Sequence, residues 1–253
     1  KHQSKEVKIE FKKIPLDKPY ISEKLVSKPL ASFESAKKQS EVLVKQGLRP
    51  IITMPSHWEL WLPIENKDKV TRNFKVKKTI INNEIIPFLI NKYTFQKLRG
   101  PISVTSDEVI KINNINYGKN FYLVKDSYGT WTLIQKLSFE EYLKGVLPHE
   151  IGANSPLEAL KAQAVIARTW AIYNSNRFEA DKFHLCVTTQ CQVYKPYIAN
   201  ENIEKAIMDT QNKVLVFEGK PINAFYHASN GGISASSSES WKMNDYPYFK
   251  PEF

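Results

Sequence analysis

The chain is poor in cysteine and has no long hydrophobic run. Two cysteines among 253 residues are too few for a small fold held together by several disulfides. The best apolar stretch, residues 80–89, is interrupted by asparagine, glutamate and proline, and it falls short of the roughly 18 residues that cross a bilayer. We therefore expect no membrane span within this chain. Because it begins with Lys1 rather than Met, any export signal or anchor would already have been removed or left out.

Glycine is also sparse, and the motifs in which it usually carries function are missing. The nine glycines form no Gly-x-Gly-x-x-Gly, Walker or Gly-x-Ser-x-Gly pattern, which argues against nucleotide binding and against an α/β-hydrolase. No repeat recurs at periods of about 20 to 50 residues, so a solenoid is excluded. With 42% hydrophobic and 25% charged residues, the chain is typical of a globular protein with one large domain or two modest ones.

Positive charge is in excess. The chain carries 36 Lys and Arg against 26 Asp and Glu, a net charge of +10, and such a field attracts nucleic acid, anionic lipid or an acidic cell-wall polymer. The lysines are spread along the chain, and no arginine-rich stripe, RNA-binding aromatic motif or zinc-finger spacing accompanies them. We therefore expect no nucleic-acid partner.

The first part of the chain predicts an extended lead-in, residues 1–30, and a small accessory α/β region, residues 31–97. The lead-in is rich in lysine and proline, and only residues 7–11 alternate as a strand does. In the accessory region Ser32 caps a predicted helix that Gly47 ends. Strands are predicted at residues 50–54, 57–62 and 74–77. The pattern from there to residue 97 fits a helix and a strand equally.

Residues 98–253 predict a larger domain in which strands precede helices. Strand-like segments lie at residues 102–104, 109–112, 120–125 and 130–134. Capping boxes at residues 138–141 and 155–158 then open two helices, a third helix follows near residues 202–210, and a hairpin spans residues 214–226. The predicted fold class is therefore α+β, with a small N-terminal α/β region and a larger mixed α/β domain.

Glu150 is the first candidate for chemistry. It lies between the first two predicted helices, where Pro148 breaks the first of them. A carboxyl at such a joint, beside Leu147 and Ile151, would be partly desolvated, and this favours the protonated form that a general acid needs. A solvated loop glutamate is the alternative.

The two cysteines are the second candidate. Cys186 and Cys191 have a spacing found in structural zinc sites, and His184 lies on the same side of an extended segment as Cys186. Three ligands for a structural Zn²⁺ could then converge, with His149 or His227 as a fourth. A local disulfide or two reduced buried thiols are equally open alternatives.

Seven further residues could contact a ligand. Arg168 lies among alanines in the long helix, where it is either an ion-paired core residue or an anion contact. Gln192 and Tyr194 alternate on one face of an extended segment and suit sugar hydroxyls, or they fill space between strands. His227 leads into a polar loop of Ser229, Gly231 and Gly232, which presents an imidazole, a hydroxyl and main-chain N–H groups together.

Four segments, in this order, resemble the stage II sporulation protein D (SpoIID/LytB) family. They are LSFEEYLKGVLPHE (137–150), EALKAQAVIARTWA (158–171), CQVY (191–194) and HASNGG (227–232). The resemblance implies that residues 98–253 form a catalytic domain with a substrate groove. The domain would be cut short at its C-terminus, because the family's domain usually runs past a segment like residues 241–248.

The resemblance also implies an activity. Members act as peptidoglycan lytic transglycosylases on glycan strands without stem peptides, and the family's catalytic acid falls on Glu150. The cysteine pair implies zinc near the active site, although Gln190 stands where many members have histidine. Some members were named amidase enhancers, so the alternative is a non-catalytic wall-binding protein that recruits an amidase. The protein would then lie outside the cytoplasm, in the cell wall or periplasm.

Residues 32–63 resemble the peptidoglycan-binding SPOR module in one helix and one strand, Trp58 to Trp61. A plain accessory α/β region is the alternative.

Overall fold

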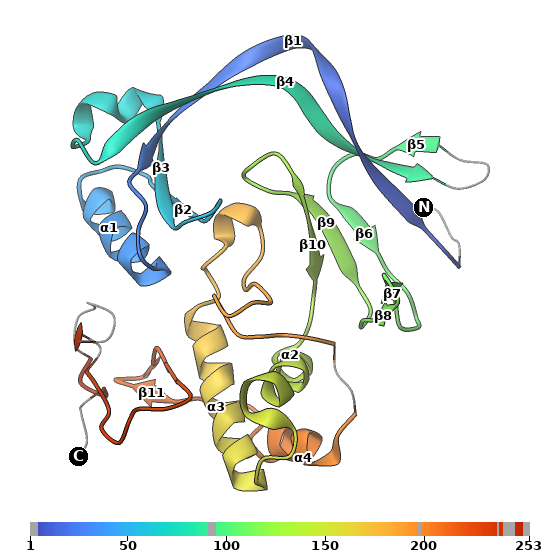
Figure 1. Ribbon diagram of the computed structural model, residues 1–253, viewed down its shortest axis with the longest axis vertical. Coiled ribbons are helices and arrows are strands. Elements are labelled where there is room, and N and C mark those ends of the chain that lie inside the picture. The colour runs from blue at the N-terminus through green and yellow to red at the C-terminus, as the bar shows by residue number, and fades with distance from the viewer. Residues whose placement is uncertain (1–4, 91–94, 197–198, 237, 240–245, 250–253) are drawn as a thin grey trace. The chain divides into compact units, whose positions relative to one another are not determined.

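The computed structural model describes residues 5–90, 95–196, 199–236, 238–239 and 246–249 (Figure 1). Its helices and strands form an α+β fold, which confirms the predicted class. The chain divides into two compact units. Unit 1 comprises Lys1–Glu108, Lys119–Lys136 and Glu179–Lys182, and unit 2 comprises Val109–Gly118, Leu137–Phe178 and Phe183–Phe253.

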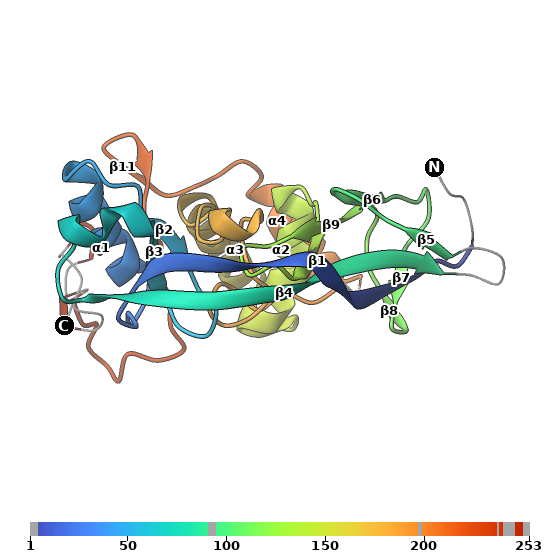
Figure 2. The same cartoon turned by 90° about the horizontal axis from the view of Figure 1, so that it is seen from above.

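A five-stranded antiparallel sheet organises unit 1. Its strand order is β2 (Ile51–Thr53), β3 (Glu59–Pro63), β1 (Lys8–Ser27), β4 (Phe74–Ile90) and β5 (Phe95–Lys97). β1 and β4 pair along almost their whole lengths and form the long two-stranded ribbon visible in Figures 1 and 2.

Most of the predicted lead-in is therefore strand β1. The pairing with β4 shifts between Pro15 and Tyr20, where Pro19 also lies. Proline has no N–H to donate to the ladder, which suits Pro19 to an irregularity in the pairing. The ambiguous residues that follow 74–77 continue as β4, because pairing with β1 selects the extended form.

Helix α1 (Phe33–Lys45) follows β1. The Ser32 side chain accepts a hydrogen bond from the Ser35 N–H, and Gly47 beyond the helix has φ +78°, so both predicted helix ends are confirmed. Leu25 of β1, Leu62 of β3 and Leu48 form a buried cluster. The 3₁₀ helix η1 (Ile64–Lys69) connects β3 toward β4.

A second sheet of unit 1 has the order β10 (Trp131–Gln135), β9 (Phe121–Lys125) and β6 (Ile102–Val104). The Trp131 indole N–H donates to the Ile85 carbonyl at 2.9 Å, and Lys125 pairs with Glu84 at 2.7 Å. These contacts attach the sheet to β4, so the strands after residue 98 group with the N-terminal sheet and not with the helices. The short hairpin of β7 (Lys111–Ile112) and β8 (Ile115–Asn116) belongs to unit 2.

Unit 2 is built on helices α2 (Phe139–Leu147), α3 (Leu157–Tyr173) and α4 (Glu201–Asp209), which pack together (Figure 1). Their shared core contains aliphatic side chains from all three helices: Leu143, Val146, Leu147, Leu160, Ala164, Ala167, Ile203, Ala206 and Ile207. The alanines of α3 remove bulk from the contact, which lets the neighbouring helices approach closely.

The predicted capping box at Ser138 is present, with Glu141 as its second member. The one predicted at Ser155 is wrong. Its hydroxyl donates to the Ile151 carbonyl, and Pro156 occupies the N-cap position of α3 without a side-chain cap. The Ser155 hydroxyl therefore bonds to the preceding turn and not to the N-terminus of α3, where the pattern had placed it.

The C-terminal hairpin is shorter than predicted. It consists of β11 (Val216–Phe217) and β12 (Lys220–Pro221), and the short 3₁₀ helix η3 (Glu179–Asp181) completes the regular elements. The predicted family segment at residues 241–248 lies largely outside the described residues. Across the described ranges, no helix combines the length and the apolar character needed to cross a membrane.

Candidate active site

Glu150 lies in a π-helical turn, η2 (Pro148–Gly152), that continues directly from α2. The sequence predicted that Pro148 would break the helix. The helix instead continues as one wider, π-helical turn, because proline supplies no N–H to an α-helical ladder. The turn ends at Gly152, whose φ of +91° suits glycine. Single π-turns often occur where a helix displays a functional side chain.

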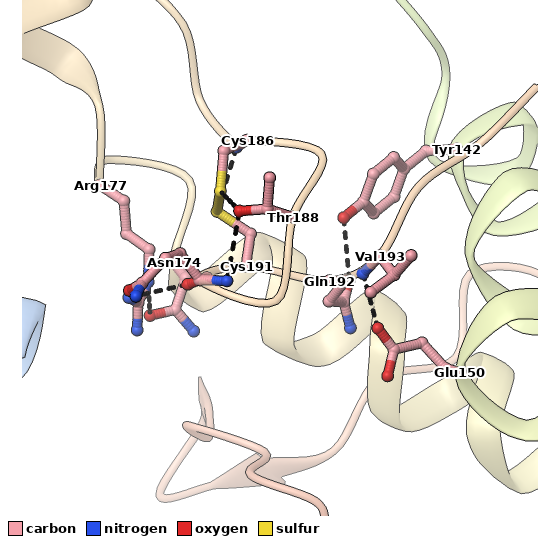
Figure 3. The surroundings of a disulfide bond; sticks show 10 residues. Tyr142, Glu150, Asn174, Arg177, Cys186, Thr188, Cys191, Gln192 and Val193 are labelled. Atoms are coloured by element: carbon pink, nitrogen blue, oxygen red, sulfur yellow. Dashed lines mark hydrogen bonds between the residues drawn. A yellow bond between two sulfur atoms is a disulfide. The ribbon is translucent and has the colours of Figure 1, made fainter.

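The Glu150 carboxylate is held by main chain from a distant segment. Its Oε1 accepts a hydrogen bond from the Val193 N–H at 2.6 Å (Figure 3). In a protonated carboxyl, an oxygen that accepts an N–H is the carbonyl oxygen, so the proton would lie on Oε2. The contact therefore distinguishes the two oxygens, and it orients a half-buried side chain.

Gln192 lies behind this contact and is fully buried. Its Oε1 accepts from the Tyr142 hydroxyl at 3.1 Å, and its amide N–H donates to the Tyr226 hydroxyl at 3.2 Å. We predicted that the Gln192 side chain contacts sugar, but its oxygen and its amide N–H are already hydrogen-bonded to two tyrosines. Gln192 positions their hydroxyls and the adjoining Val193 main chain.

The two tyrosines border Glu150, and sequence reasoning did not single them out. Burial and then the neighbouring Tyr226 and Glu150 raise the pKa of Tyr142. Burial and then Glu150 raise the pKa of Tyr226. Both phenols are therefore neutral at physiological pH and keep their O–H groups as hydrogen-bond donors. The available signal was their position, since Tyr142 lies inside the first family segment and Tyr226 directly precedes the last one.

Tyr194 packs on α2 through a glycine. Its ring stacks on that of Tyr142, with centroids 5.7 Å apart, and burial raises the pKa of Tyr194 to about 12. A Cβ placed on Gly145 would collide with the Tyr194 ring and with the Lys195 carbonyl. The Lys195 N–H also donates to the Gly145 carbonyl at 3.2 Å. Gly145 therefore permits the close approach that brings the Val193 N–H to Glu150.

His149 precedes the glutamate and is exposed. Burial and then Lys195 lower the pKa of His149, so the imidazole is neutral at physiological pH.

Arg168 requires a correction. It is 2% exposed, and its guanidinium binds both carboxylate oxygens of Glu140, with Nη2 at 2.7 Å from Oε2. Nη1 donates to the carbonyls of Thr210 and Lys213 at 2.9 and 3.0 Å. The side chain thus ties α2 and α3 to the segment after α4 and is no surface for substrate. Its hydrogen-bond partners are thus Glu140, Thr210 and Lys213, and not Glu150.

Cys186 and Cys191 form a disulfide (Figure 3). The Cys186 N–H donates to the Cys191 sulfur at 3.0 Å, and Cys191 is followed directly by Gln192. His184 is exposed, and the described residues contain no group of three or more potential ligands that could hold a metal ion. The arrangement therefore does not fit zinc while the sulfurs are joined. Zinc on a reduced pair stays a prediction.

The loop after Tyr226 is exposed at His227, Ser229, Gly231 and Gly232. The Gly232 N–H donates to the Asn230 side chain at 2.9 Å, so the loop satisfies part of its own main chain. The loop begins directly after Tyr226, which lies beside Glu150. Contact of these four residues with substrate stays a prediction.

Residues 127–217 match the model of the SpoIID family, described as stage II sporulation protein. This region is thus similar to the SpoIID family, and it contains three of the four segments that indicated the resemblance. It is 44% identical over 106 residues to the amidase enhancer of Bacillus subtilis (strain 168), covering 42% of this chain and 14% of that protein. It is 31% identical over 133 residues to stage II sporulation protein D of the same organism, covering 46% of this chain and 38% of that protein.

An uncharacterized protein of Brachyspira hyodysenteriae is 37% identical over 131 residues, covering 50% of this chain and 34% of that protein. The chain therefore spans well under half the length of these curated relatives.

Proposed function

We propose that the protein is a peptidoglycan lytic transglycosylase with Glu150 as its single catalytic carboxyl. The substrate would be glycan strands without stem peptides, cut between N-acetylmuramic acid and N-acetylglucosamine. The observation that carries the proposal is the Glu150 carboxyl itself, oriented by the Val193 N–H and bordered by Tyr226, in a segment of the SpoIID match.

One carboxyl serves both proton transfers in this reaction. Protonated Glu150 donates from Oε2 to the glycosidic oxygen as the bond to the muramic C1 breaks. The resulting carboxylate takes the proton of the muramic C6 hydroxyl, whose oxygen bonds to C1 and closes a 1,6-anhydro ring. A hydrolase would normally need a second carboxylate for water or covalent attack. The groups that border Glu150 are instead phenols, an amide and a main-chain N–H.

The decisive experiment is incubation with purified glycan strands without peptides, followed by mass spectrometry. We expect products that end in 1,6-anhydro-N-acetylmuramic acid, and Glu150→Gln to reduce their formation by about 100-fold or more, because the amide cannot exchange the proton. Glu158→Gln is the matched control, since that side chain is 82% exposed. Reducing ends from added water would show a hydrolase, and unimpaired cleavage by Glu150→Gln would remove the assignment.

A second candidate is a non-catalytic protein that binds glycan and stimulates an amidase. The observation that favours it is the 44% identity to a protein named amidase enhancer. Intact glycan in the assay above, together with faster amidase release of stem peptides, would establish this function instead.

Both candidates place the protein outside the cytoplasm, in the cell wall or periplasm, with glycan strands as a partner. The second candidate adds an amidase. The disulfide supports this location, since such bonds persist in oxidising compartments. Zinc binding by reduced Cys186 and Cys191, with His184 as a third ligand, would be a structural alternative to the disulfide.

A further inference from the structure

The net positive charge of the chain comes from one of its two units. The segments of unit 1 contain 25 Lys and Arg against 15 Asp and Glu, whereas unit 2 has 11 of each. The whole net charge of +10 thus lies in unit 1. Most of unit 1 is outside the residues that match the SpoIID family model. An excess of this kind creates a field that concentrates anionic partners on one part of the molecule.

Part of this charge gathers on the ribbon of β1 and β4. Lys24 lies directly opposite Lys77 across the two strands, and Lys75 lies opposite Val26 in the next pair on the same face. Lys24, Lys75 and Lys77 are called the ribbon lysines below. Consecutive strand residues alternate between faces, so the run Lys77–Lys78 places an ammonium group on each face.

The ribbon lysines are poorly compensated. Lys75 and Lys77 are exposed, and no carboxylate of the described residues lies within salt-bridge distance of either. By contrast, Lys78 on the opposite face pairs with Glu23 at 3.0 Å. Like charges placed directly opposite each other destabilise a sheet, and a bound anion would relieve that repulsion.

Lys24 is held in place at this cluster. Its ammonium lies 2.8 Å from the centre of the Trp61 ring, and the Trp61 indole N–H donates to the Glu59 carboxylate. The acid whose charge acts on Lys24 is Glu59, and it already accepts a hydrogen bond from Trp61. Burial and then Lys77 lower the pKa of Lys24 to about 8. The ring therefore fixes a cation beside two others, in an arrangement that favours an anionic ligand.

We propose that the ribbon lysines bind a linear phosphodiester polymer of the cell wall. Residues two apart in a strand lie about 7 Å apart, which is comparable to the separation of phosphates joined by a short polyol. Trp61 is 7% exposed and covered by Lys24, so it offers no ring for stacking bases. The choice of a wall polymer over other anions rests on the proposed function.

The test compares two variants of equal charge. Lys24→Gln/Lys75→Gln/Lys77→Gln removes the ribbon lysines, and Lys45→Gln/Lys67→Gln/Lys69→Gln removes three exposed lysines of α1 and η1 in the same unit. Binding to purified poly(glycerol phosphate) is measured by titration calorimetry at several salt concentrations. We expect the ribbon variant to weaken binding at least tenfold at low salt, with a flatter salt dependence, and the control to change it much less.

The double variant Lys75→Gln/Lys77→Gln keeps Lys24 on Trp61 and should already weaken binding several-fold. Equal losses in the two triple variants would show that general charge and not the ribbon attracts the polymer. Tighter binding to duplex DNA or to anionic phospholipid vesicles than to the wall polymer would also overturn the proposal. Glycan cleavage is assayed separately on peptide-free strands that lack the polymer. Loss of glycan cleavage and loss of polymer binding can therefore be told apart.

Discussion

Gly145→Ala tests whether close packing between α2 and the segment at residue 193 positions the catalytic carboxyl. In an unconstrained helix this substitution stabilises a protein by about 1 kcal/mol, because alanine has the higher helix propensity. Here the new Cβ would collide with the Tyr194 ring and with a main-chain oxygen of Lys195, which cannot rotate away. The segment must therefore move.

The magnitude follows from the contacts that this movement loses. The hydrogen bond from Lys195 to the Gly145 carbonyl contributes about 1 kcal/mol, and the stacking of Tyr194 on Tyr142 contributes about 0.5–1.5 kcal/mol. Residual overpacking adds a cost of about 1 kcal/mol. After the gain in helix propensity, we expect a net destabilisation of about 1.5–2.5 kcal/mol.

We expect Gly145→Ala to affect the rate of glycan cleavage more strongly than the stability of the fold. Movement of the segment takes the Val193 N–H away from Glu150, although Glu150 itself is unchanged. A displacement of about 1 Å can cost about 100-fold in rate, so cleavage should fall while the protein remains folded.

The assays are urea denaturation and the glycan cleavage assay. Tyr194→Ala is the partner variant, because removing the ring relieves part of the collision, and the double variant should lose less stability than the sum of the two singles. A Gly145→Ala protein that is more stable than the parent and fully active would refute the reasoning.

Three further predictions concern other contacts. Glu140→Gln leaves the Arg168 cation buried without its carboxylate and should lower the unfolding free energy by about 3 kcal/mol in urea denaturation; a loss below about 1 kcal/mol would contradict a structural role for the pair. The pKa of Lys24 is lowered to about 8 by burial and a neighbouring lysine, so between pH 8 and its ordinary value of 10.5 the unfolded chain binds more protons. The parent should therefore gain stability with rising pH across that window relative to Lys24→Met, and parallel stability curves would count against it. Purified under oxidising conditions, the protein should contain a Cys186–Cys191 disulfide by mass spectrometry and lose melting temperature on reduction; bound zinc, found by elemental analysis with both thiols reduced, would favour the metal instead.

Local sequence signals were sufficient for much of the helical architecture. Ser32 and Ser138 each precede an apolar run, and each caps its helix as predicted. Glu150 was also identified before the structure, since its segment carries the family motif. Caps and periodic apolar faces act over a few residues, so the physical cause is contained within the window in which the pattern is seen.

Tertiary pairing decided the features for which the local pattern was ambiguous or misleading. The proline-containing lead-in became strand β1 because β4 supplies hydrogen-bond partners along its length. Ser155 bonded the Ile151 carbonyl instead of capping α3. In both places, groups close in space competed successfully with a weak local preference.

The chemistry of the site required the same long-range information. Sequence alone determined which carboxyl to examine, but it could not show that Val193, 43 residues later, donates to it. It offered Arg168 both as a core cation and as an anion contact, and the facing Glu140 decided for the core. The amino-acid sequence specifies which ionisable residues are present. Its role depends on desolvation and on hydrogen-bond partners that only the folded chain brings within reach.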